Sequence, residues 1–215
     1  MEIKNLVERL SRGYSNKDRT SLFLVKDVVL LVYDIAGYTK FCDYHESRDE
    51  HDPVNKLTYA FITGGKEVIR YFGGIPHNFT GDGYLSSFDF KDASETEVHE
   101  RAIDAALTLQ ELDREFNSID FFGGYEPMLK VALYRGKTSF RNGRKKDEMP
   151  FGRAPSKLAR IGTECRPGEI LASGSAIDPV RDLYDIDEIR GIQLRGVSEQ
   201  KGIHRVYGKK DGIEI

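Results

Sequence analysis

Cysteine is scarce in this chain, and it lacks long apolar runs. The 215 residues include two cysteines, Cys42 and Cys165, far apart and without C-x-x-C spacing. One long-range disulfide could join them, but free thiols in a reducing compartment are the simpler interpretation. No apolar run approaches the ~20 residues of a membrane span, and the N-terminal residues lack the apolar core of a signal peptide. We therefore expect a cytoplasmic protein that does not enter the membrane.

An excess of basic charge is also missing. Lys and Arg number 32 against 35 Asp and Glu, a formal net charge of −3. Because binding to nucleic acid or to anionic membrane needs a basic surplus, neither is expected as a partner. Hydrophobic residues make up 39% of the chain and charged residues 31%. These fractions are ordinary for a soluble globular protein with a buried core.

The order of periodic segments predicts one α+β domain. Apolar residues at helical spacing predict helices near residues 2–12, 54–71, 95–117 and 154–162. Apolar runs predict strands that begin near residues 28, 129 and 169, and hairpins over residues 72–90 and 192–208. Such an order favours helices that cover a mainly antiparallel sheet.

Two aspartates stand where a charge needs a partner. Asp34 ends the apolar run that starts at Val28, and a charge at the end of a buried strand is costly unless it is paired. Asp82 lies in the turn of the first predicted hairpin. If these two ends are adjacent in the sheet, the carboxylates face each other and cannot both stay ionised without a cation between them. Mg²⁺ suits the position because it takes oxygen ligands and completes its shell with phosphate and water.

Small residues follow Asp34. Ala36 and Gly37 would let a polyphosphate approach the backbone N–H groups at the start of the next helix. A lone aspartate at a strand end is more often a turn former or a helix cap. The two aspartates together, in this setting, favour a metal site.

Five motifs in order resemble those of the class III nucleotidyl cyclase catalytic domain. They are LLVYDIAGYTKF, GGIPHNFTGDGYLSSF, ALYRGKTSF, FGRAPSKLARIGTECRPGEILAS and IQLRGV. The resemblance covers residues 26–208, between an N-terminal helix and linker (1–25) and a C-terminal tail (209–215). It implies a ferredoxin-like cyclase fold that works as a head-to-tail homodimer. It also implies an enzyme that converts a nucleoside triphosphate to a 3′,5′-cyclic nucleotide and pyrophosphate, with two Mg²⁺ or Mn²⁺ ions per site.

The resemblance assigns metal and phosphate contacts by position. Asp34 and Asp82 match the two metal-binding aspartates, with the Ile35 carbonyl as a further ligand. The adjoining substrate-binding residues are Gly37, Tyr38 and Thr39.

Two arginines match residues that the family uses on phosphate. Arg160 matches the catalytic arginine that stabilises the pentavalent phosphorus transition state and comes from the partner subunit. Arg195 stands where a lysine usually holds the terminal phosphates. An arginine keeps that charge and adds a bidentate fork.

Three positions depart from the family pattern. Ser156 stands where an asparagine orients the ribose. Asn78 and Met149 stand where purine cyclases read the base, with lysine and aspartate or threonine for adenine, and glutamate and cysteine for guanine. Neither purine code is present. Three alternatives follow: a pyrimidine cyclase, a purine (adenylate) cyclase with unusual contacts, or a degenerate nucleotide-binding sensor domain.

The base-reading positions favour UTP. Asn78 can turn its amide to serve uracil or cytosine, whereas Met149 removes the acceptor that an exocyclic amino group would need. We expect cyclic UMP ahead of cyclic CMP. Stand-alone cyclases without the purine code resemble the pyrimidine cyclases of bacterial Pycsar antiphage systems, which implies a separate effector protein activated by the cyclic nucleotide.

Overall fold

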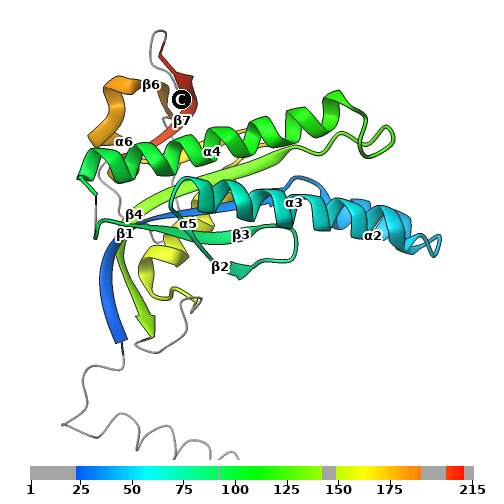
Figure 1. Cartoon of the computed structure of the whole chain (residues 1–215), viewed down its shortest axis with the longest axis horizontal. Coiled ribbons are helices and arrows are strands. Elements are labelled where there is room, and N and C mark those ends of the chain that lie inside the picture. Colours follow the sequence, from blue (N-terminus) through cyan, green and yellow to red (C-terminus); the bar gives the residue numbers. More distant parts are fainter. Residues whose placement is uncertain (1–22, 92, 142–148, 190–201, 211–215) are drawn as a thin grey trace, which may run out of the picture.

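The structure, a computed structural model, describes residues 23–91, 93–141, 149–189 and 202–210 (Figure 1). A seven-stranded sheet with the order β2-β3-β1-β4-β5-β7-β6 forms its centre. Among the described strands, β4 and β5 pair in parallel and the other neighbours are antiparallel. The strands are β1 (Phe23–Ile35), β2 (Ile75–Phe79), β3 (Tyr84–Asp89), β4 (Leu129–Arg141), β5 (Ile170–Ser173), β6 (Tyr184–Ile189) and β7 (Ile203–Lys209).

Helices cover both faces of this sheet. Figure 1 shows α3 (His51–Tyr71) and α4 (Glu95–Ser118) running side by side across one face, with α5 (Arg153–Glu164) on the other. The shorter elements are α2 (Tyr38–Glu46), α6 (Gly174–Ile177) and the 3₁₀ helix η1 (Asp178–Leu183). None of the helices within the described ranges is both long and apolar enough to cross a bilayer.

Strand β1 divides the core in two because its side chains alternate between the faces. Val29 and Leu31 belong to the larger apolar cluster, with side chains of α3 and α4. Val28 and Leu30 belong to the smaller cluster, with three residues of α5. All four side chains are fully buried. The charged residue at the end of β1 is therefore held on a strand that is fixed from both sides.

Most of the predicted elements are found. The predicted helices near 54–71, 95–117 and 154–162 correspond to α3, α4 and α5, and the first predicted hairpin is β2–β3. The predicted N-terminal helix and residues 192–201 lie outside the described residues. The second arm of the last predicted hairpin is β7, which pairs with β5 and with β6, a strand that was not predicted.

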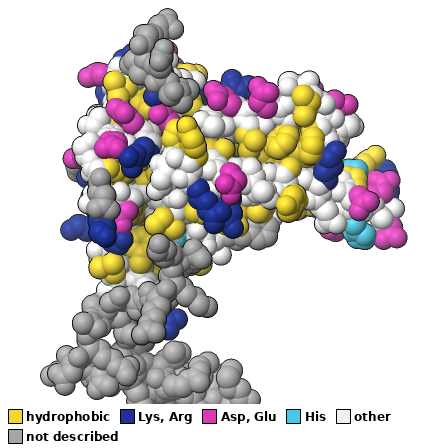
Figure 2. Space-filling model, viewed as in Figure 1, with side chains coloured by type: hydrophobic (Ala, Val, Ile, Leu, Met, Phe, Trp, Pro, Cys, Tyr) yellow, Lys and Arg dark blue, Asp and Glu magenta, His cyan; other side chains and the backbone are white. Residues whose placement is uncertain are grey.

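Helix α2 lies before the predicted helix near 54–71, in a part of the chain for which no helical range was predicted. None of its residues is fully buried, so it lacks the apolar stripe by which a helix is predicted. Figure 2 shows acidic and histidine side chains gathered at the end of the molecule where α2 lies. No group of three or more His, Cys, Asp or Glu side chains suited to a metal ion occurs in the described ranges.

Candidate active site

Asp34 and Asp82 meet beside the end of β1. The Ile35 N–H donates a hydrogen bond to Asp82 Oδ2 at 3.3 Å, which fastens the β2–β3 turn to this strand. Gly83 permits the approach, because a Cβ there would lie 1.8 Å from the Tyr33 carbonyl oxygen. The Asp82 carboxyl is in turn hydrogen-bonded to Asp34. A carboxyl group from the end of β1 and one from the β2–β3 turn are thus held together.

Burial and the neighbouring acid change how Asp82 titrates. Burial raises the pKa of Asp82 to about 7, and the hydrogen bond and negative charge of Asp34 act in the same direction. The Ile35 N–H opposes the shift. Near neutral pH Asp82 is therefore partly protonated, and a divalent cation could replace that proton.

Lys130 is the cation that accompanies Asp34. The two residues are opposite each other in the β1–β4 register, and Lys130 Nζ lies 2.9 Å from Asp34 Oδ2. Lys130 was not predicted from the sequence, although this lysine interrupts the apolar run of β4 as Asp34 interrupts that of β1. The ammonium of Lys130 thus supplies a positive charge next to the two carboxyl groups.

The backbone after β1 turns directly into α2. Ala36 N–H donates to the Met128 carbonyl at 2.9 Å, and Gly37 precedes the helix with φ 76°, a left-handed conformation that glycine adopts easily. Tyr38 Oη lies 2.7 Å from Thr58 Oγ1, which links α2 to α3. Thr39 is exposed. The first N–H groups of α2 thus follow Asp34 by only a few residues along the chain.

The candidate catalytic residues on α5 lie on the same side of the sheet as Asp34. Asp34 is four residues after Leu30, a member of the cluster beneath α5, so the alternation of β1 directs both side chains to that face. Arg160 is half-buried and Ser156 is exposed. They are one turn apart on α5, so they share one side of the helix.

The remaining predicted contacts are spread over the chain. Asn78 is half-buried in β2, opposite Leu85 of β3. Met149 is 57% exposed and precedes Phe151, which forms a bridge with Ser139 of β4. Arg195 lies outside the residues that the structure describes.

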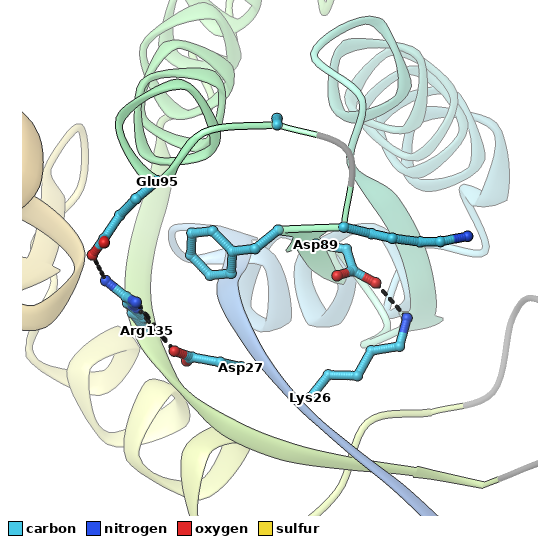
Figure 3. A pocket seen from close by; sticks show the side chains of 8 residues that line it. Lys26, Asp27, Asp89, Glu95 and Arg135 are labelled. Carbon is cyan, nitrogen blue, oxygen red and sulfur yellow. Dashed lines mark hydrogen bonds and ion pairs between the residues drawn. The ribbon is translucent and has the colours of Figure 1, made fainter.

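A second cluster of charges lies at the opposite end of β1. Figure 3 shows Arg135 between Asp27 and Glu95, beside a cavity of about 540 Å³. Lys26 is paired with Asp89 at its edge. Because these charges are paired with one another, we interpret the cluster as a structural link between β1, β3, β4 and α4.

No protein family model and no curated protein matches this chain. Solved structures do resemble it. The adenylyl cyclase CyaB from P. aeruginosa matches with a TM-score of 0.77 and 16% identity, covering 89% of this chain and 99% of that chain. The guanylyl cyclase Cya2 matches with a TM-score of 0.76 and 20% identity over 89% and 97% of the two chains.

A third solved structure is the guanylate cyclase domain of RhGC from Catenaria anguillulae in complex with GTP. Its TM-score is 0.70 at 16% identity, over 86% of this chain and 98% of that chain. Likeness at such identities shows the fold. The α+β class III cyclase fold expected from the sequence motifs is therefore confirmed.

Proposed function

We propose that this chain is a nucleotidyl cyclase that converts a nucleoside triphosphate to a 3′,5′-cyclic nucleotide and pyrophosphate. The observation that carries the proposal is the contact between Asp34 and Asp82. Two carboxyl groups this close, with the pKa of one raised toward neutrality, are suited to a divalent cation. Adenylyl and guanylyl cyclases with the same fold, one of them solved with GTP, support this activity.

The residues present fit Mg²⁺ or Mn²⁺. Asp34, Asp82 and the Ile35 carbonyl would hold the metal, and Mg²⁺ commonly takes only one or two carboxylates together with phosphate oxygens. The Asp34 side chain is 41% exposed, so the site is open to substrate. Two bound ions would acidify the ribose 3′-hydroxyl and neutralise charge on the phosphates.

The reaction needs no side-chain nucleophile. The 3′-oxygen attacks the α-phosphorus in line with the leaving group, and an O3′–Pα bond forms. The bond between the α-phosphorus and the oxygen that bridges to the β-phosphorus breaks, the hydroxyl proton passes to solvent, and pyrophosphate leaves. The N–H groups from Gly37 to Thr39 would donate hydrogen bonds to phosphate oxygens. Lys130, released from Asp34 when the metal binds, would pair with the phosphates.

Arg160 would act across a subunit interface. In a head-to-tail homodimer, the carboxyl pair of one protomer would face Arg160 of the partner subunit. Its guanidinium would stabilise the charge that develops on the phosphorus oxygens. Ser156, one turn earlier on α5, would approach the ribose, and Arg195 the terminal phosphates.

The base is proposed to be a pyrimidine, with UTP preferred over CTP. Asn78 offers both a donor and an acceptor, whereas Met149 offers only a weak acceptor in place of a carboxylate. The product, cyclic UMP, would signal to a separate effector protein in antiphage defence, as the likeness to stand-alone pyrimidine cyclases suggests.

The test is a direct assay of purified protein. Each of the four nucleoside triphosphates is incubated with Mn²⁺ or Mg²⁺, and cyclic products are identified by mass spectrometry. Cyclic UMP is expected as the main product, and Asp34→Ala should abolish it. Dominant cyclic AMP would refute the argument from Asn78 and Met149. No cyclic product from any triphosphate would refute the cyclase and favour a nucleotide-binding sensor.

A further inference from the structure

Strand β2 contains one extra residue, His77, next to Asn78. Pro76 is paired with Ser86 of β3, and the next pair joins Asn78 to Leu85. The pairing thus advances by two residues on β2 but by one on β3, which is a β-bulge. Bulges bend a strand and redirect its side chains, and they are common beside active sites.

The bulge leaves His77 and Asn78 on the same face of the sheet, the face on which α5 lies. Leu85 belongs to the apolar cluster beneath α5, and Ser87, two residues further along β3, points the same way. His77 Nε2 lies 2.6 Å from Ser87 Oγ, so the imidazole is on that face as well. Asn78, paired with Leu85, shares it. In a regular strand, two successive side chains would point to opposite faces.

The imidazole of His77 is held from two directions. Ser87 is 2% exposed and His77 is half-buried, so the hydrogen bond between them is partly buried. The ring of Phe140, from β4, has its centroid 5.6 Å from that of His77, at a tilt of 45°. The hydrogen bond and the neighbouring ring together restrict the position of the His77 side chain.

We propose that His77 is a specificity-determining residue that limits the size of the base. This inference rests on the proposed function, in which Asn78 reads the base. The imidazole lies on the same face as Asn78, and with a base bound against Asn78 it would take up space that the second ring of a purine needs. A pyrimidine, with one ring, fits the shortened pocket. His77 excludes ATP and GTP by bulk, and Ser87 keeps its ring in place.

The experiment compares kcat/KM for UTP, CTP, ATP and GTP in four variants. His77→Ala should raise the purine-to-pyrimidine ratio about tenfold or more, since pocket contacts of this size discriminate by roughly 10–200-fold. His77→Phe keeps the bulk but loses the hydrogen bond to Ser87, so its ratio should shift far less than that of His77→Ala and no more than that of Ser87→Ala. Ser87→Ala frees the ring and should shift the ratio in the same direction by less. The matched control is Ser86→Ala, a buried serine on the opposite face of β3, which should leave the ratio unchanged.

The outcomes separate the inference from the proposed function. Wild-type protein without any cyclic product refutes the proposed function. Suppose that the wild type is an active cyclase. If His77→Ala leaves the purine-to-pyrimidine ratio unchanged, or lowers kcat/KM for all four triphosphates equally, only the proposed role of His77 in limiting base size is refuted. Should His77→Ala fail to fold, the test is the comparison of the purine-to-pyrimidine ratio of Ser87→Ala with that of Ser86→Ala. Equal base ratios in those two variants would refute the filter.

Discussion

Lys130 and Asp34 face each other across the β1–β4 pair, with 2.9 Å between Nζ and Oδ2. This ion pair answers the question that the sequence raises about the charge at the end of β1. It also gives Lys130 two alternative partners, because a bound metal would compete with it for Asp34. The ammonium would then be available to an anionic ligand.

Lys130→Met should therefore separate metal binding from substrate binding. We expect Mn²⁺ to bind several-fold more tightly in titration calorimetry, because the competing ammonium is gone, while KM for the triphosphate rises. Lys137→Met is the matched control, an exposed lysine of β4 opposite Asp27 in the register. Unchanged or weaker Mn²⁺ binding by Lys130→Met would contradict the competition.

Gly83→Ala should disrupt the close contact between the β2–β3 turn and β1 that brings Asp82 to Asp34. The new Cβ would lie 1.8 Å from the Tyr33 carbonyl oxygen, so the β2–β3 turn must move away from β1. We expect loss of activity and a lower melting temperature, with a destabilisation of about 2 kcal/mol or more. Gly208→Ala, where a Cβ would meet nothing within 4 Å, should behave as the wild type. An active Gly83→Ala protein would mean that the turn need not touch β1.

Mixing two inactive variants tests the shared site. Asp34→Ala lacks the metal ligand and Arg160→Ala lacks the arginine contributed to the partner, so one of the two sites in a mixed dimer stays intact. Random exchange should restore about a quarter of the wild-type activity, since half the dimers are mixed and each has one working site. If the mixture stays inactive although both variants dimerise and exchange, the sites are not shared.

Asp113 gives the stability of the protein a measurable pH dependence. Its Oδ2 accepts a hydrogen bond from Leu129 N–H at 2.7 Å, but burial raises its pKa from 3.8 to about 6. The folded state therefore binds a proton more tightly than the unfolded state, and this contribution is lost as the pH rises from about 4 to about 6.

The measurement compares wild type with Asp113→Asn, which keeps an acceptor for Leu129 but cannot titrate. The free energy of unfolding of the wild type, relative to the variant, should fall by up to ~2 kcal/mol across that window and stay level above it. Parallel pH profiles of the two proteins would show that Asp113 titrates normally.

The sequence predicted the parts of the site that follow from local pattern. Asp34 is conspicuous because it interrupts an apolar run, and Asp82 because it lies in a glycine-flanked turn. Lys130 was missed because its importance depends on the β1–β4 register, which joins residues 96 positions apart. The bulge at His77 cannot be read from the sequence of β2 alone, since it is defined by the pairing with β3.

Two elements were missed for different physical reasons. Helix α2 buries no side chain fully, so no apolar stripe marks it. Strand β6, with the sequence YDIDEI, alternates apolar and acidic residues over its first four positions before Glu188 breaks the pattern, so a short period-two alternation could have indicated it. Its partner β7 was correctly expected to be a strand, but its pairings with β5 and β6 depend on the tertiary fold.

The thirteen-residue ladder between β1 and β4 makes the site sensitive to strand register. A slip of one residue would exchange the two faces of β1. Asp34 would then enter the core beneath α3 and α4, and the buried Tyr33 would emerge on the face of α5. Ion pairs near both ends of β1, Asp27 with Arg135 and Asp34 with Lys130, would be broken together by such a slip. The ion pair between Asp27 and Arg135 in Figure 3 therefore favours the strand register that places Asp34 beside Asp82, although it lies away from them.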